Sequence, residues 1–307
     1  MGTDIKKAAD VCRNILTVAF LLAAAAHPAM AQDQFFNSNG VQIRYVEQGT
    51  GEPIVLVHGY TGNLDLSWME TGVFQNLAKD HHVIALDNRG HGKSGKPHDP
   101  KSYGTEMSED IVRLMDHLNI RRAHIIGYSL GGRIVSKLVT MHPDRFLTAI
   151  LGGNGLNTAA DEPDAEAVKV EAAETARGDF HSLIVRTAAT DQPPPSDEAI
   201  RAMSRQTVER GNDPLALAAF VRTRRSLTVT KEQMAAVRVP MLAVVGSLDP
   251  NLEKVNRLKA ALPSLKVVVI QGAPHSGATP PIGAARRPEF VNAVREFIAA
   301  HKDTGSP

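Results

Sequence analysis

The chain has 307 residues, and its 34 Lys and Arg nearly balance its 33 Asp and Glu. With 43% apolar residues, 22% charged residues and a single cysteine, it is too apolar to be disordered and too poor in cysteine to be a disulfide-stabilised scaffold. It also lacks the excess positive charge with which nucleic-acid-binding proteins neutralise phosphates, so we expect no nucleic-acid partner.

The first segment, residues 1–31, has the composition of a secretory signal peptide. Basic residues as far as Arg13 precede an apolar run over residues 15–26, which is shorter than the roughly 20 residues that span a bilayer. Ala-Met-Ala follows at residues 29–31, and small residues of this kind suit cleavage. We therefore expect an exported protein, periplasmic or secreted, that loses its only cysteine, Cys12, with the signal. No other run is long enough to predict a membrane span.

The rest of the chain alternates between buried strands and helices. Short apolar runs, typical of strands covered on both faces, lie at residues 53–57, 82–86, 123–126, 146–151, 241–245 and 267–270. Residues 41–47 alternate like a strand, and the Gly-Thr-Gly turn that follows makes a hairpin-like pair with residues 53–57. Helical patterns cover residues 108–118, 134–141 and 290–299. This order predicts an α/β fold with a mostly parallel sheet, flanked by helices and extended by an antiparallel edge.

Residues 153–238 break this alternation. They carry only helical patterns, at residues 165–177, 180–189, 197–210 and 214–225, which indicates a helical cap or lid. The core is then formed by residues 32–152 and 239–307. Six arginines in the second half of the cap are expected to form a solvated face rather than to receive an acidic substrate or a membrane surface: Arg201, Arg205, Arg210, Arg222, Arg224 and Arg225.

A G-x-S-x-G motif at residues 127–131 places Ser129 between a buried strand and a helix. A serine at such a junction must turn sharply in a strained backbone conformation that exposes its hydroxyl group. The glycines two residues to either side would remove side chains that clash at the bend. Ser129 is therefore the candidate nucleophile.

A serine hydroxyl needs a base to accept its proton and an acid to orient that base. Asp249 follows the strand at residues 241–245, and His275 follows the strand at residues 267–270. These equivalent positions, in the order serine, acid, histidine, predict a catalytic set of Ser129, Asp249 and His275.

The backbone N–H groups of Leu130 and Tyr60 are the candidate donors to an oxyanion, since Leu130 begins the helix after Ser129 and Tyr60 follows Gly59 in the loop after an early strand. His58 could compete as a base, but a structural role in holding this loop is favoured. Trp68, the only tryptophan, and Tyr128 are weaker candidates for lining the substrate pocket.

Five motifs together resemble the α/β-hydrolase fold superfamily: HGYTG after a strand, D-x-R-G-x-G-x-S at residues 87–94, GYSLGG, GSLDP and GAPHSG. They occur in order and cover nearly all of residues 36–300 except the insertion. The resemblance implies an eight-stranded, mostly parallel sheet with the cap inserted after the sixth strand. It also implies that Asp87 and Arg89 fix a loop and take no part in catalysis.

Within this superfamily, a serine nucleophile implies an acyl-enzyme. Members that resemble haloalkane dehalogenases or epoxide hydrolases carry an aspartate at this position, so those two chemistries are disfavoured. A carboxylic ester of small or medium size is the expected substrate. Lactonase, carbon–carbon bond hydrolase, perhydrolase and acyltransferase activities share the same three residues, and a noncatalytic binding protein is the alternative outside enzymes. No motif predicts a metal site or a cofactor, and the oligomeric state stays open.

Overall fold

The computed structural model describes residues 31–275 and 283–302. The predicted signal peptide lies outside these residues except for Ala31, so its role in export stays a prediction. Among the residues that are described, no helix is long and apolar enough to cross a membrane.

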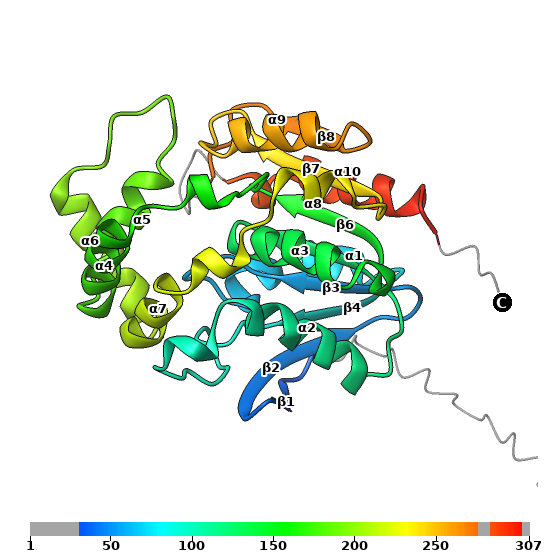
Figure 1. Ribbon diagram of the computed structural model, residues 1–307. Coiled ribbons are helices and arrows are strands. Elements are labelled where there is room, and N and C mark those ends of the chain that lie inside the picture. The colour runs from blue at the N-terminus through cyan, green and yellow to red at the C-terminus, as the bar shows by residue number, and fades with distance from the viewer. Residues whose placement is uncertain (1–30, 276–282, 303–307) are drawn as a thin grey trace, which may run out of the picture. The chain divides into compact units, whose positions relative to one another are not determined.

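The described residues form one eight-stranded sheet in the order β1-β2-β4-β3-β5-β6-β7-β8. The strands are β1 (Gln34–Ser38), β2 (Val41–Gln48), β3 (Pro53–Val57), β4 (His82–Leu86), β5 (Ala123–Tyr128), β6 (Phe146–Gly152), β7 (Met241–Gly246) and β8 (Lys266–Ile270). Strands β3 to β8 pair in parallel, whereas β1 and β2 form an antiparallel edge. The predicted α/β fold with a mostly parallel sheet is therefore confirmed (Figure 1).

The hairpin predicted between residues 41–47 and 53–57 does not form. Strand β2 pairs with β1 and with β4, and β4 separates it from β3. Parallel β3 and β4 both carry near-continuous apolar runs and are buried side by side, whereas the half-polar β2 suits the outer position. The partner that the pattern missed, β1, joins β2 through the tight turn at Asn39 and Gly40.

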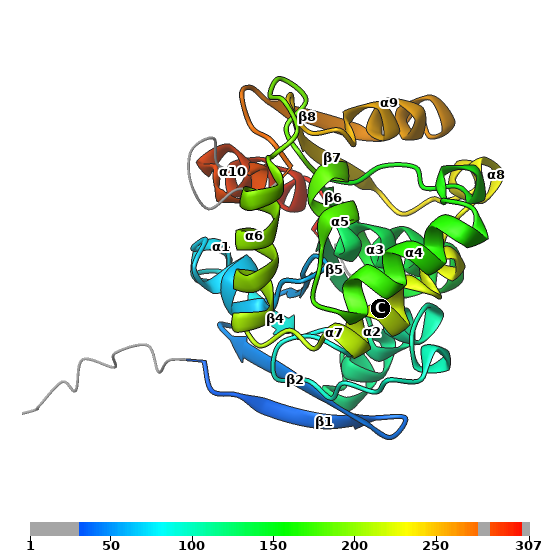
Figure 2. The ribbon, with the colours of Figure 1, turned by 90° about the vertical axis from the view of Figure 1, so that its left-hand side faces the viewer.

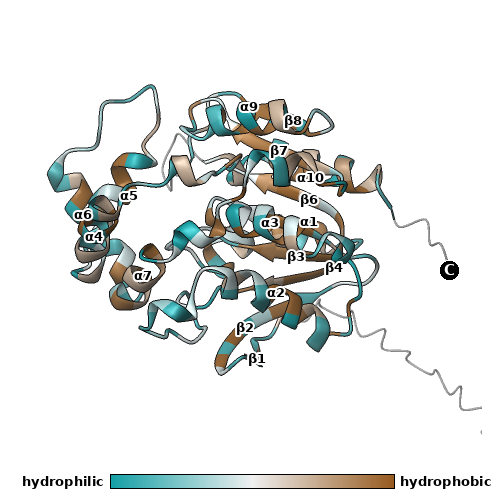
Figure 3. Ribbon diagram, in the orientation of Figure 1, coloured by the Kyte–Doolittle hydropathy of each residue, from teal (hydrophilic) through white to brown (hydrophobic). Residues whose placement is uncertain are grey.

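Each face of the sheet packs against its own set of helices, because successive side chains of a strand point to opposite faces. One face, with Val55 and Val57 of β3, packs on α2 (Thr105–His117), α3 (Leu130–Met141), α8 (Lys231–Ala235) and α9 (Leu252–Ala261). The other face, with Ile54 and Leu56, packs on α1 (Val73–Leu77) and α10 (Pro288–Ala299). The strands accordingly form the most hydrophobic part of Figure 3, and polar residues lie on the outer sides of the helices.

Between β6 and β7 the chain forms the cap helices α4 (Ala165–Ala176), α5 (His181–Arg186), α6 (Asp197–Glu209) and α7 (Pro214–Val221), followed by a short turn at Arg224–Leu227 and α8. Figure 2 looks onto this group. A small apolar cluster of Phe180, Ile184, Ile200 and Leu217 holds the cap helices together and contacts Tyr60 of the loop after β3. The Tyr60 hydroxyl also donates to the Leu217 carbonyl at 3.2 Å, so the cap is tied directly to this loop.

Candidate active site

Ser129 occupies the sharp bend between β5 and α3. Its backbone angles, φ 54° and ψ −112°, lie in a region that L-residues rarely adopt, which agrees with the strained turn predicted for it. A Cβ atom on Gly127 would collide with the Gly131 carbonyl, and one on Gly131 would collide with the Val57 carbonyl. Both glycines are needed because the backbone on either side of Ser129 packs this tightly.

Ser129, His275 and Asp249 form one continuous chain of hydrogen bonds. The Ser129 Oγ lies 2.9 Å from His275 Nε2, and His275 Nδ1 lies 2.8 Å from Asp249 Oδ2. His275 and Asp249 are 4% and 2% exposed, so bulk water does not compete for the bond between them. Because the carboxylate accepts from Nδ1, Nε2 carries the lone pair that faces the serine hydroxyl. The structure thus brings together the three residues that the sequence singled out.

Two further residues hold this chain in position. The Tyr128 hydroxyl donates to the His275 carbonyl at 2.6 Å, and its ring lies 5.8 Å from the imidazole, centroid to centroid. The Asn251 backbone N–H donates to the second oxygen of Asp249 at 2.8 Å, while its side-chain amide donates to the Gly153 carbonyl at 3.1 Å. Sequence reasoning missed Asn251, for which the only signal was its place two residues after the acid.

The loop after β3 approaches the serine closely at Gly59. A Cβ atom there would lie 3.3 Å from the Ser129 Cβ, so a larger residue would press against the nucleophile. Tyr60 and Leu130 both line the cavity that contains Ser129. Leu130 is the first residue of α3, and the first N–H groups of a helix have no partner within it. This arrangement suits the oxyanion role predicted for the two N–H groups.

His58 is fully buried and holds the same loop. Its Nε2 accepts from the Asn88 backbone N–H at 2.9 Å, and its Nδ1 lies 2.7 Å from the Gly59 carbonyl. Both bonds require a neutral imidazole with its proton on Nδ1, and burial lowers the pKa of His58 in the same sense. Because the Nε2 lone pair accepts this hydrogen bond, His58 has the structural role that the sequence favoured.

The loop at residues 87–94 is fixed by buried ion pairs. Asp87 accepts from the Leu64 and Lys93 backbone N–H groups, both at 2.8 Å. Arg89 binds both oxygens of Asp110, at 2.6 and 2.7 Å. These contacts are those of loop-fixing residues.

A cavity of about 150 Å³ opens beside Ser129 and His275. It is lined from the core by residues of α3 and α9 and from the cap by residues including Leu183 and Phe220. Neither Trp68 nor Tyr128 is among its lining residues. Trp68 is fully buried in the core between the sheet and α1, and Tyr128 packs behind the histidine. The structure thus places both outside the cavity that they were expected to line.

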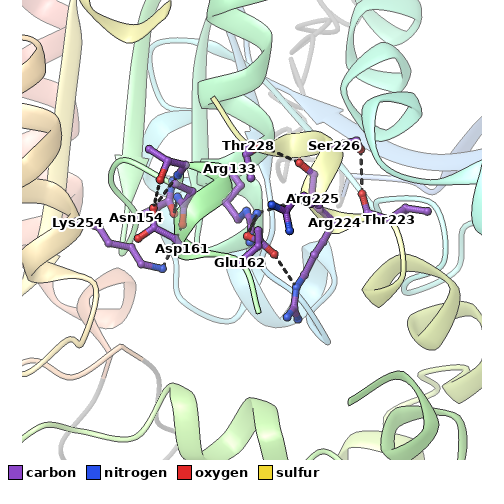
Figure 4. A network of polar contacts seen from close by, with 12 residues as sticks. Arg133, Asn154, Asp161, Glu162, Thr223, Arg224, Arg225, Ser226, Thr228 and Lys254 are labelled. Carbon is purple, nitrogen blue, oxygen red and sulfur yellow. Dashed lines mark hydrogen bonds and ion pairs between the residues drawn. The ribbon is translucent and has the colours of Figure 1, made fainter. Parts of the chain in front are cut away.

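Charged residues form a large part of the cavity wall, as Figure 4 shows around Glu162. Arg224 is one of them: it is 5% exposed and bonds to Glu162 at 3.0 Å and Glu171 at 2.6 Å. The expectation of a solvated face is wrong for Arg224, whereas the other five arginines of that group are exposed. An arginine in an alternating polar segment looks the same in sequence whether its partners are water or buried carboxylates. Among the described residues, no group of three His, Cys, Asp or Glu side chains could hold a metal ion.

Comparison with known proteins agrees with this architecture. The family model described as the alpha/beta hydrolase fold matches residues 52–234. Esterase YbfF of Escherichia coli K12 is 40% identical over 99 residues, which cover 32% of this chain and 37% of the esterase. The 3-oxoadipate enol-lactonase 2 of Acinetobacter baylyi is 27% identical over 217 residues, 68% of this chain and 77% of the lactonase.

In several curated relatives with 35 to 40% identity, the match spans only about a third of the relative's length. Among solved structures, a bromoperoxidase from Bacillus anthracis superposes with a TM-score of 0.69 at 21% identity and covers 87% of this chain and all of its own. At this identity the likeness concerns the fold alone. The matched family model, the sheet order and the serine at the bend after β5 agree, and the chain belongs to the α/β-hydrolase fold family.

Proposed function

We propose that this protein is a serine hydrolase that cleaves a carboxylic ester of small or medium size through an acyl-enzyme on Ser129. The observation that carries the proposal is the hydrogen-bonded chain from Asp249 through His275 to the Ser129 hydroxyl. A serine in this arrangement is activated because the histidine accepts its proton as the hydroxyl attacks.

The reaction has two halves. Ser129 Oγ attacks the ester carbonyl and its proton moves to His275 Nε2, while the Asp249 carboxylate stabilises the imidazolium that forms. The N–H groups of Tyr60 and Leu130 donate to the oxyanion of the tetrahedral intermediate. His275 then gives its proton to the departing alcohol. In the second half, a water molecule gives a proton to His275 and attacks the acyl-enzyme; His275 then returns that proton to Ser129 Oγ as the acyl–oxygen bond breaks and the acid is released.

The size of the cavity bears on the substrate. A cavity of about 150 Å³ is comparable to an engineered protein cavity that holds one benzene molecule. We therefore expect short acyl chains to be cleaved faster than long ones, because a long chain would have to displace the cap.

Lactones are cyclic esters, and the enol-lactonase relative aligned over 68% of this chain makes lactone hydrolysis the second candidate. The same acyl-enzyme would open the ring, with the leaving alcohol retained in the product. Carbon–carbon bond hydrolysis, perhydrolysis and acyl transfer need a different substrate or acceptor at the same serine.

The test is a series of para-nitrophenyl esters of increasing chain length, with a simple lactone and a ring-cleavage product analogue assayed beside them. Ser129→Ala is expected to lower kcat/KM for the best ester at least about 10⁴-fold, because the nucleophile is removed. The matched control is Ser136→Ala, a buried serine on the same helix whose hydroxyl has no hydrogen-bond partner among the described residues. It should keep its activity.

Labelling with a fluorophosphonate probe separates the alternatives. The wild-type protein should be labelled and Ser129→Ala should not. Turnover of the ring-cleavage analogue without turnover of esters would replace the ester proposal with carbon–carbon bond hydrolysis. Absence of both labelling and turnover would favour a noncatalytic binding protein.

A further inference from the structure

The cavity beside Ser129 is lined by more positive than negative side chains. Four cationic residues line it, Arg133, Arg186, Arg224 and Lys254, against two acidic ones, Asp161 and Glu162. Two more charges contact these from outside the lining: Glu171 bonds to Arg186 and Arg224, and Arg257 bonds to Asp161. The whole group thus holds five cations and three carboxylates.

The three carboxylates of this group leave two of the five cations without a carboxylate of their own. Glu162 is shared, with one oxygen bonded to Arg133 and the other to Arg224. Glu171 is shared by Arg224 and Arg186, which both bond to its Oε1, and Asp161 pairs with Arg257. Figure 4 shows Glu162 beside Arg133 and Arg224, with Lys254 and Asp161 next to them. Two carboxylates therefore serve three arginines, and none remains for the lysine.

Arg133 is the first of the two. Its side chain is 16% exposed, and its Nε is buried with no hydrogen-bond partner among the described residues. Among the described residues, its hydrogen bonds run from one terminal nitrogen, Nη2, to Glu162 and to the Arg224 carbonyl. A buried guanidinium with unused donors is costly unless an anion occupies them. Burial also lowers the pKa of Arg133.

Lys254 is the second. Its ammonium group donates to the Asn157 side-chain oxygen at 3.2 Å, and that partner is a neutral amide. No carboxylate of the described residues forms an ion pair with it. Burial and, to a smaller extent, the nearby positive charge of Arg133 lower the pKa of Lys254, so the folded site disfavours the charged form of this lysine.

Both cations lie close to the reacting group. Arg133 lies in the first turn of α3, directly after Ser129, and its backbone N–H donates to the Ser129 carbonyl at 3.1 Å. Lys254 lies in the first turn of α9, five residues after Asp249. Both line the same small cavity as Ser129 and His275.

We propose that Arg133 and Lys254 bind a free carboxylate of the substrate, so that the preferred substrate is an ester or lactone that carries a second, ionised carboxyl group a few atoms from the bond that is cleaved. This inference rests on the proposed function, since it names the substrate class of the same site. The carboxylate supplies one of the two negative charges by which the three acids fall short of the five cations, and the arginine and lysine donors can bind it through charge-assisted hydrogen bonds.

The test compares matched pairs of substrates that differ only in this charge. One pair places the carboxylate on the acyl part: the mono-para-nitrophenyl ester of glutaric acid against para-nitrophenyl pentanoate. The other places it on the leaving group: the acetate ester of para-hydroxybenzoate against phenyl acetate. In at least one pair, the wild-type kcat/KM should favour the anionic member by about 10- to 100-fold, the worth of one or two charge-assisted hydrogen bonds.

Lys254→Gln should remove most of this preference, because it raises KM for the anionic ester more than KM for the neutral ester, and Lys254→Arg should restore the preference. Arg225→Gln is the matched control, because it removes an exposed cation next to Arg224 that does not line the cavity. Lys254→Gln breaks no ion pair among the described residues, and thermal unfolding checks that the variant is folded. Equal rates for both members of each pair in the wild type, or an unchanged preference in Lys254→Gln, would overturn the inference while leaving the esterase proposal intact.

A binding measurement separates the two proposals completely. Calorimetric titration of glutarate into Ser129→Ala should show binding that Lys254→Gln, introduced into the same variant, weakens about 10-fold or more. Binding of glutarate without any ester turnover would support the anion site and count against the proposed hydrolysis. Absence of glutarate binding to Ser129→Ala would count against the anion site.

Discussion

Asp249 is almost fully buried, and both of its carboxylate oxygens accept hydrogen bonds. One oxygen accepts from His275 and the other from the Asn251 N–H. The carboxylate therefore has a single orientation, and that orientation keeps the proton of His275 on Nδ1. Whether Ser129 faces a base or a donor depends on this one proton.

Asp249→Asn is expected to lower kcat on the order of 10⁴-fold without unfolding the protein. Its remaining oxygen would still accept from the Asn251 N–H, so its NH₂ group would face the imidazole and favour the tautomer that cannot take the serine proton. Steady-state kinetics with the best ester, at several pH values, measures the effect. Asp144→Asn, which changes an exposed aspartate, should have none. A loss of less than about tenfold would identify another residue as the orienting acid.

The sequence predicted the three residues of the hydrogen-bonded chain, because each follows an apolar strand at the same edge of the sheet. The strand before His275, β8, was expected to be covered on both faces, but it is the edge strand of the sheet and is partly exposed. The sequence could not predict that Arg133 and Lys254 line one cavity, because they belong to different helices and come together only through the packing of α3, α9 and the cap. The pocket role predicted for Trp68 was wrong for the same reason. A large aromatic residue near a catalytic loop fits a pocket or a core equally well, and only the packing of α1 decides.

The residue that follows β6 lies against both the acid and the base of the site. Gly153, which follows this strand, has φ +54°, and a Cβ atom there would lie 3.1 Å from Asp249 Oδ2 and 3.2 Å from His275 Nδ1. A glycine at this place therefore lets the backbone pass beneath the Asp249–His275 hydrogen bond.

Gly153→Ala is expected to lower kcat/KM at least about tenfold, because the methyl group would displace the acid from the imidazole, and to reduce stability by about 1 to 2 kcal/mol through backbone strain. Ester kinetics and thermal unfolding measure the two effects. Gly40→Ala is the control: Gly40 also has a positive φ, 84°, but a Cβ atom there would contact nothing. It should lose stability and keep its activity. Equal activity in both variants would show that crowding at Gly153 is unimportant.

Most strands and the longer helices could be predicted from the sequence because their apolar periodicity is strong. Strands β3 and β4 have the bounds that the pattern predicted. The order of strands could not. Residues 41–57 read as a hairpin, yet β4 comes between the two strands: apolar β3 pairs with β4 and β5, and the half-polar β2 lies on the outer side of β4. Short α1 and α8, of five residues each, carry too little periodicity to be recognised.

The stability of the whole molecule is linked to pH through buried histidines. His91 has a buried Nε2 with no hydrogen-bond partner among the described residues, and its ring lies 5.3 Å from that of His58. Burial, and secondly the neighbouring His58, lowers the pKa of His91 to about 3. The unfolded chain binds a proton near the ordinary value of about 6.5, and the folded chain does not until about pH 3. His91 therefore leaves the free energy of unfolding at its full value above pH 6.5, and lowers it progressively as the pH falls from 6.5 towards about 3.

His91→Asn should flatten the decline of unfolding free energy between about pH 6 and pH 4 by up to about 1.4 kcal/mol per pH unit, whatever it costs at neutral pH. The asparagine amide can replace the bond from His91 Nδ1 to the Arg89 carbonyl, 3.0 Å in length, and cannot take up a proton. Denaturant unfolding at a series of pH values measures the slope. His181→Asn, at an exposed cap position, is the control. The same slope in the His91 variant and the wild type would assign the acid sensitivity to other groups.

The insertion of the cap between β6 and β7 divides the catalytic residues along the chain. Ser129 follows β5 and is made before the insertion, whereas Asp249 arrives only after the insertion and β7, and His275 only after β8. While the protein is still growing on the ribosome, its serine has no base and is a weak nucleophile. The order of synthesis therefore delays completion of the Asp249–His275–Ser129 hydrogen-bonded chain until β8 and the loop after it have been translated.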